Sequence, residues 1–163
     1  TPAPVPRTQK AEKPWDYARF YPTWRTPMAL LHELETQSSG TGTPLVEVLD
    51  VLPYNEQGLI AAIAQDATSR EVLMLAWMNR EALEATITQG VVTYFSRSRQ
   101  ALWRKGETSG HTQTLKAMHI DCDGDAILLT VQQSGPACHT NRPTCFYLCV
   151  EGEQVVIASE PVN

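Results

Sequence analysis

The chain has 163 residues, of which 42% are hydrophobic, and this length and composition suit one folded domain with a short appendage and exclude wholesale disorder. Its formal net charge of −5 argues against a general nucleic-acid binder, which needs surplus Lys and Arg, so we expect no nucleic-acid partner. No apolar run reaches the ~18 residues of a membrane-spanning helix, so we expect no membrane span.

Residues 1–45 read as an N-terminal extension and linker that differ from the rest of the chain. Prolines interrupt regular structure, yet the segment is unusually aromatic, with Trp15, Tyr17, Phe20, Tyr21 and Trp24. Disordered linkers are poor in aromatic residues, so part of the extension is expected to dock on a surface, and a partner protein is possible there. One short helix is expected over 27–36, followed by a linker over 38–44.

The first residue is Thr1 and not Met, which is compatible with a trimmed chain or a removed leader. We expect a cytoplasmic protein. The alternative is an organelle matrix or stroma, reached with a leader that was then cleaved.

The body, residues 46–163, alternates short apolar segments with polar turns. Strands are expected at 46–52, 59–65, 71–77, 91–95, 114–121, 126–132, 146–150 and 154–158. One main helix is expected over 80–89, because Asn79 suits its N-cap and Gly90 its C-cap. Residues 96–111 are polar and rich in turn formers. Many short strands with one helix predict a small β-rich domain of the α+β class.

Three carboxylates, Asp121, Asp123 and Asp125, alternate in the sequence DCDGD. If this segment is extended, they share one face and Cys122 projects from the other. Oxygen ligands of this kind suit a hard ion such as Mg²⁺, although a solvated acidic turn is the plainer alternative. The spacing is not that of an EF-hand, because the Gly and Glu that such a loop requires are missing.

Four cysteines fall within 28 residues, beside acidic residues and His139. Cys122, Cys138 and Cys145 do not have the paired spacing of a closed structural zinc site. Three thiolates would leave a fourth zinc position for water, whose pKa zinc lowers to about 7. The alternative is three inert core cysteines, and Cys149, in an apolar stretch, is expected to belong to the core.

The segment 103–111, WRKGETSGH, combines cations, hydroxyl groups and glycines that suit a phosphate-binding loop. Arg97 and Arg99 add positive charge upstream, in an otherwise acidic body. Trp103 suits stacking on a base or simple core packing. His111 is either a general base or an ordinary surface histidine.

Three blocks, WRKGETSGHTQ, DCDGD and GPACHTNRPTCF, resemble in order and spacing the signature blocks of the phosphoribosyl-AMP cyclohydrolases. The upstream stretch GLIAAIAQDATSREVLMLAWMNREAL and the SRSR motif also fit that family. The resemblance covers about residues 50–150. It implies an enzyme that hydrolyses the N1–C6 bond of the adenine ring of 1-(5-phosphoribosyl)-AMP in histidine biosynthesis, giving the formimino-carboxamide ribonucleotide.

The resemblance also implies an intertwined homodimer that binds Zn²⁺ and Mg²⁺. Zinc would be held by Cys122 of one subunit with Cys138 and Cys145 of the other, and magnesium by the three aspartates. His111 and His139 are the candidate proton carriers. The candidate substrate contacts are Arg97, Arg99, Trp103, Arg104, Lys105 and Ser109.

The family often carries a second enzyme domain after this one, and the chain, which ends at Asn163, is expected to catalyse one step only. An alternative from another class is a partly or wholly non-catalytic subunit of a larger assembly, docked through residues 1–45. The complete set of metal and loop residues weighs against that alternative.

Overall fold

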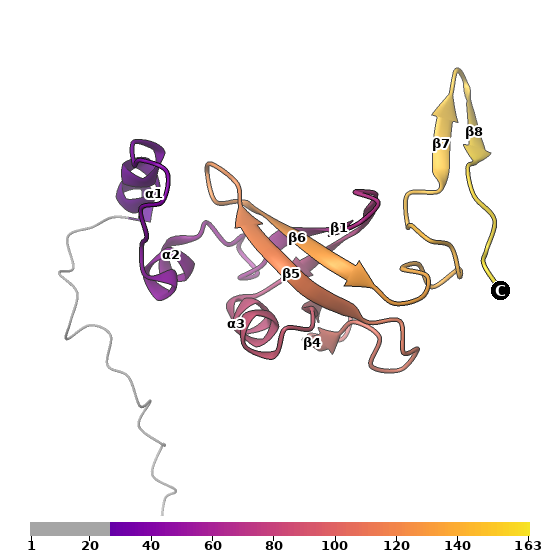
Figure 1. Ribbon diagram of the computed structural model, residues 1–163, viewed down its shortest axis with the longest axis horizontal. Helices are drawn as coiled ribbons and strands as arrows, with labels where there is room; N and C mark the ends of the chain where they lie inside the picture. The colour runs from indigo at the N-terminus through magenta and orange to yellow at the C-terminus, as the bar shows by residue number, and fades with distance from the viewer. Residues whose placement is uncertain (1–26) are drawn as a thin grey trace, which may run out of the picture.

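The chain is built around a four-stranded mixed sheet, and the computed structural model describes residues 27–163 (Figure 1). The strand order is β2-β1-β6-β5, with bounds Ile60–Asp66 for β1, Val72–Met78 for β2, Gln113–Ile120 for β5 and Ala126–Gln133 for β6. β1 runs parallel to β6, and the two outer pairs are antiparallel. Helices beside a largely antiparallel sheet confirm the predicted α+β class.

One face of the sheet forms the core. Alternate residues of β1, such as Ile60, Ala62 and Ala64, are buried, and so are Ile127 and Leu129 of β6. The period-2 pattern arises because successive side chains of a strand point to opposite faces. The other face is only half covered in a single chain.

Helix α3, Arg80–Gln89, is confirmed at the predicted bounds and is the longest of the three helices in the described residues. The Asn79 side chain accepts a hydrogen bond from the N–H of Ala82 at 2.8 Å. Gly90 ends the helix in the left-handed conformation, with φ 70°. Ala82 and Leu83 are buried on the face that packs against the sheet, so cap chemistry and apolar spacing agree.

Two further helices precede the sheet. α1, Pro27–Glu35, confirms the short helix predicted there, whereas α2, Leu45–Val51, replaces a predicted strand. The prediction for 46–52 was wrong because Leu49 and Leu52 lie three residues apart and are buried on one side, which a helix achieves and a strand does not. The aromatic residues at 15–24 lie outside the described residues.

Two small hairpins complete the fold. β3, Thr93–Ser96, confirms the strand predicted at 91–95, and it pairs with β4, Ala101–Arg104, which lies in the segment expected to be a turn-rich loop. β4 is only four residues long and flanked by basic residues, so its apolar pattern is too short to stand out. β7, Leu148–Glu151, and β8, Gln154–Ile157, form a hairpin that projects from the body (Figure 1).

No helix in residues 27–163 has the length and apolar character needed to cross a membrane.

Candidate active site

A pocket of about 380 Å³ lies where the loop between β4 and β5 meets the loop after β6. Seven of the residues proposed from the sequence line it together: Trp103, Lys105, Ser109, His111, Cys138, His139 and Cys145. They come from two sequence blocks, and the antiparallel pairing of β5 with β6 brings the two loops side by side because His111 precedes β5 and Cys138 follows β6. The arrangement joins thiols, imidazoles and a cation around one cavity.

The thiols of Cys138 and Cys145 both line this pocket, and each perturbs the pKa of the other. Burial raises the pKa of the Cys138 thiol, but the Thr140 hydroxyl, which donates to its sulfur at 3.1 Å, and further hydrogen bonds lower it by more, so that the pKa lies below its ordinary value. Burial and then the neighbouring Cys138 raise the pKa of Cys145 to about 11. The Cys138 thiol therefore ionises before that of Cys145, and its charge opposes ionisation of Cys145; a bound cation would favour the ionised form of both thiols.

A buried lysine lies beside the two thiols. Lys105 is only 6% exposed, and its Nζ lies 5.7 Å from the centroid of the Trp103 ring. Burial lowers the pKa of Lys105, while the ionised forms of Cys145 and Cys138 raise it. A buried cation that faces an open cavity suits contact with an anionic group of a ligand.

His111 lies between two glycines that allow its backbone and ring to come close. A Cβ at Gly106, which has φ 82°, would lie 2.6 Å from the carbonyl carbon of His111. A Cβ at Gly135 would lie 2.6 Å from Cδ2 of the His111 ring. The Ser109 hydroxyl accepts a hydrogen bond from the His111 N–H at 3.2 Å. The loop thus holds the imidazole at the pocket wall, in reach of a ligand.

Three predicted substrate contacts lie outside this pocket. Arg97 stacks on the Trp77 ring at 5.3 Å and lines a separate hollow with Gln57. Arg99 approaches Glu107 at 4.0 Å, and Arg104 is exposed at the end of β4. Arg99 and Arg104 adjoin residues of the pocket wall, whereas Arg97 contacts Trp77 near the other end of the sheet, and none of the three lines the pocket.

The three aspartates gather at the opposite end of the sheet, in the turn between β5 and β6. Each offers one carboxylate oxygen, and these oxygens all lie within 4.8 Å of one another. The expectation of an extended segment with sulfur and oxygen on opposite faces is wrong, because Gly124, at φ 79°, reverses the chain. The carboxylates converge through the turn and not through strand alternation.

The crowded carboxylates perturb one another. Burial raises the pKa of Asp121, but the Ala126 N–H and bonds within the turn lower it below its ordinary value. The pKa of Asp125 is raised, first by its hydrogen bond with Asp121 and then by the charge of Asp123. Three exposed carboxylates held this close fit a hard divalent cation.

Cys122 is exposed in the same turn. Within one chain it therefore lies at the opposite end of β6 from the loop that contains Cys138 and Cys145. The eight residues of β6 lie between them and span roughly 25 Å. Cys149, expected in the core, is exposed on β7 instead, because no other part of residues 27–163 covers its hairpin.

The pocket also contains residues that the sequence reasoning did not single out. Glu107 and Thr108 line it from the same loop as Ser109, and Asn141 from the loop that carries His139. Their place in two already suspected loops was a signal that could have found them. Met74 enters the wall from β2, and its position in an apolar strand gave no such signal.

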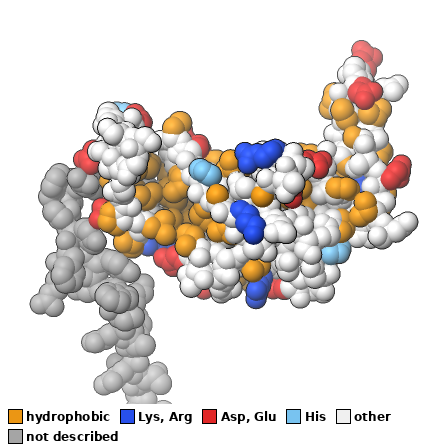
Figure 2. Space-filling view, viewed as in Figure 1, with side chains coloured by type: hydrophobic (Ala, Val, Ile, Leu, Met, Phe, Trp, Pro, Cys, Tyr) orange, Lys and Arg blue, Asp and Glu red, His pale blue; other side chains and the backbone are white. Residues whose placement is uncertain are grey.

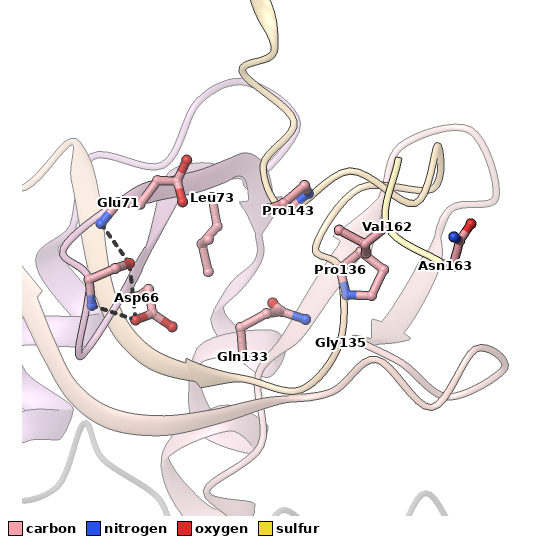
Figure 3. A pocket seen from close by; sticks show the side chains of 10 residues that line it. Asp66, Glu71, Leu73, Gln133, Gly135, Pro136, Pro143, Val162 and Asn163 are labelled. Atoms are coloured by element: carbon pink, nitrogen blue, oxygen red, sulfur yellow. Dashed lines mark hydrogen bonds between the residues drawn. The ribbon is translucent and has the colours of Figure 1, made fainter. Parts of the chain in front are cut away.

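A second pocket, of about 400 Å³, borders the loop after β6 and is shown in Figure 3. Asp66 and Glu71 give it an acidic wall beside Gln133. Asp66 accepts hydrogen bonds from the N–H groups of Thr68 and Ser69, at 2.9 and 2.8 Å. This pocket contains no residue that the sequence proposed for the site. The carboxylate of Asp66 already accepts hydrogen bonds from its own turn.

The comparisons with known proteins agree with the grouping of these residues. The model of the family described as phosphoribosyl-AMP cyclohydrolase matches residues 74–147, which include every residue that lines the first pocket. Phosphoribosyl-AMP cyclohydrolase 2 of Pseudomonas fluorescens is 56% identical over 139 residues, covering 85% of this chain and 94% of that protein. The phosphoribosyl-AMP cyclohydrolase of Dinoroseobacter shibae is 61% identical over 112 residues, covering 68% of this chain and 94% of that protein.

The match to the Pseudomonas fluorescens protein reaches beyond residues 46–163, the body of the chain. Residues 46–163 number 118, so a match of 139 residues extends at least 21 residues into the segment before residue 46. At 56% identity over nearly the whole length of the relative, common ancestry and a common fold are secure. The chain therefore belongs to the phosphoribosyl-AMP cyclohydrolase family.

Proposed function

We propose that this chain is a phosphoribosyl-AMP cyclohydrolase that opens the adenine ring of 1-(5-phosphoribosyl)-AMP in histidine biosynthesis. The observation that carries the proposal is the single pocket that joins the thiols of Cys138 and Cys145 to His111 and Lys105. Family membership supports the same reaction. The non-catalytic alternative has no comparable support.

The chemistry explains why such a pocket is needed. Substitution at N1 makes C6 of the adenine ring electrophilic, so water adds to C6, the N1–C6 bond breaks, and N1 takes up a proton. His111 or His139 would accept the proton of the attacking water and return one to N1, since both line the cavity. The product is the formimino-carboxamide ribonucleotide.

The remaining pocket residues suit binding of the nucleotide. Lys105, with Ser109 and the loop N–H groups, would contact phosphate oxygens, and Trp103 would stack against the base or ribose. Arg97, Arg99 and Arg104 stay predicted phosphate contacts. All three are exposed, and Arg99 and Arg104 adjoin pocket residues, so these two are placed to reach a ligand larger than the cavity.

Zinc fits the thiol pair. Cys138 and Cys145 would hold it together with Cys122 of a second copy, because Cys122 of the same chain lies at the far end of β6. Two thiols that line one pocket and perturb each other's pKa suit a soft divalent cation that both would bind. When bound, zinc would lower the pKa of a water molecule to about 7.

Magnesium fits the aspartate turn. Asp121, Asp123 and Asp125 would hold it, since three converging carboxylate oxygens are the ligands that a hard cation prefers. Because Cys122 belongs to the same turn, a homodimer that brings Cys122 to the partner's pocket would bring these aspartates there as well. Magnesium would then neutralise phosphate charge or orient the substrate.

A homodimer also accounts for the apolar surface that residues 27–163 of one chain leave exposed. Figure 2 shows hydrophobic side chains along the projecting β7–β8 hairpin, where Val150 is 75% exposed and Leu148, Val155 and Ile157 are more than half exposed. Leu75, in register with Ile63 and Leu128 on the open face of the sheet, is 48% exposed. A two-stranded hairpin is barely stable alone, so we expect both surfaces to be buried against a second copy.

Chelation tests the metal part of the proposal. The purified protein should convert 1-(5-phosphoribosyl)-AMP to product, and removal of zinc with a strong chelator should lower turnover at least about a hundredfold. Added Zn²⁺ should restore it. Product absorbance and the metal content of the same samples are the measurements. Turnover that survives complete loss of zinc would contradict the proposed metal chemistry, and absence of turnover in zinc-loaded dimer would contradict the proposed reaction.

The cytoplasmic location and a partner protein for the N-terminal extension stay predictions.

A further inference from the structure

A row of polar side chains, fully buried at its core end, connects the core to the loops around the pocket. The Tyr94 hydroxyl donates to Oε1 of Gln113 at 2.7 Å, and Nε2 of Gln113 donates to Oε1 of Gln133 at 2.9 Å. Nε2 of Gln133 then donates to the carbonyl of Ser134 at 3.1 Å and approaches the carbonyl of His111 at 3.5 Å. Tyr94 and Gln113 are 0% exposed. Three strands, β3, β5 and β6, thus contribute one residue each to a single hydrogen-bonded row.

The direction of every bond in the row follows from its first donor. Burial raises the pKa of Tyr94 well above its ordinary value, so the hydroxyl stays protonated and has one hydrogen to donate. Once the Gln113 oxygen accepts that hydrogen, its amide nitrogen must face Gln133, whose own nitrogen then faces the loop carbonyls. The core end of the row holds its members firmly, because a broken bond at Tyr94 or Gln113 would leave a buried polar group unpaired, whereas Gln133 is half-buried.

The far end of the row lies where the two pocket loops meet. Figure 3 shows Gln133 where β6 ends and the chain turns toward Gly135 and Pro136. The N–H of Ser134 donates to the carbonyl of Thr112 at 2.9 Å, so the loops are also joined directly through their backbones. Because the ring of His111 packs against Gly135, a shift of the Ser134 loop would move the imidazole as well.

We propose that Tyr94, Gln113 and Gln133 are positioning residues that hold His111 in register with the thiol-bearing loop. None of them lines the first pocket, so their effect passes through the loop backbone and not through contact with substrate. The inference rests on the proposed role of His111 in that pocket. The imidazole is then positioned from the core side of its loop, through the hydrogen-bonded amides of Gln113 and Gln133 that lead from Tyr94.

A positioning role differs measurably from a purely stabilising one. Loss of a positioning bond should lower kcat, since misplacement of a catalytic group by about 1 Å costs on the order of 100-fold. It should leave KM nearly unchanged, because the phosphate-binding groups keep their places. A purely stabilising bond would lower the melting temperature and leave kcat of the folded enzyme intact.

The test uses Gln133→Met, with Gln132→Met as the matched control on the same strand. Gln132 is exposed and not part of the row, so the control makes the same chemical change without breaking it. In the zinc-loaded dimer we expect Gln133→Met to lower kcat about 10- to 100-fold, with KM within about twofold and the zinc content unchanged. Gln113→Met should behave alike, and Gln133→Met keeps the test decisive if the fully buried Gln113 variant does not fold.

A second readout follows the imidazole itself. The ring signals of His111 in the NMR spectrum, assigned with His111→Ala, should shift in Gln133→Met and stay in place in Gln132→Met. A folded Gln133→Met with the kcat and His111 signals of the control would overturn the inference. If His111→Ala keeps full activity, the proposed role of His111 fails and the inference fails with it. If His111→Ala is inactive and Gln133→Met is normal, only the inference fails.

Discussion

Replacement of Cys138 by serine is expected to lower turnover by at least about a thousandfold while the fold persists. Cys138 and Cys145 both line the pocket, and Cys138 has the lower pKa of the two, which makes it the first thiol available to a metal. A serine hydroxyl stays protonated near neutral pH and is a poor zinc ligand, so the variant should lose zinc. The pKa of water at the site would then return toward its bulk value of about 15.7.

The measurements for this variant are kcat, zinc content and the thermal midpoint. Cys138 is 4% exposed, so the near-isosteric serine should cost no more than about 2 kcal/mol of stability. Cys149→Ser, at an exposed position on β7, is the matched control and should keep its zinc. A Cys138→Ser protein that unfolds would assign the metal a structural role, and one that keeps both zinc and turnover would remove Cys138 from the ligand set.

The second large effect is expected at His111. Substitution by glutamine keeps a side chain of similar length against Gly135 but removes the group that exchanges protons. General acid–base catalysis contributes about 100- to 10,000-fold, so kcat should fall by at least about 100-fold with little change in KM. Steady-state kinetics of the zinc-loaded variant give both quantities.

Two other histidines make this result interpretable. His32 is the control, because it is exposed on α1 and does not line the pocket. The variant His32→Gln should behave as the unaltered protein. His139 lines the same pocket and is the competing candidate. If His139→Gln is the inactive variant and His111→Gln keeps its kcat within about threefold, the proton carrier is His139.

Local signals in the sequence predicted most of the elements. The α3 helix was found from its caps, and the long strands β1, β2, β5 and β6 from their apolar runs, since these signals lie within the element itself. α2 was mistaken for a strand because a seven-residue apolar segment fits both periods. β4 was missed because only its pairing with β3 makes those four residues a strand.

The site was predictable in its chemistry but not in its geometry. The blocks that hold Lys105, His111 and Cys138 identified the kind of residues needed, and the structure joins them in one pocket. The separation of Cys122 from Cys138 depends on the length of β6 and on which end each loop occupies. The buried row through Gln113 left no motif, because a glutamine in a strand reads as an ordinary polar residue until its partners are known.

The proposed active site is complete only when the Asp121–Asp125 turn of a second chain joins the pocket of the first. Cys122→Ser and Cys138→Ser subunits, coexpressed with different affinity tags, can be purified as a heterodimer and compared with the two inactive parent dimers. If Cys122 serves the partner's thiols, the heterodimer retains one intact site of two, so we expect about half of the normal turnover and about one zinc per dimer. A heterodimer as inactive and as zinc-free as its parents would contradict a site shared between chains.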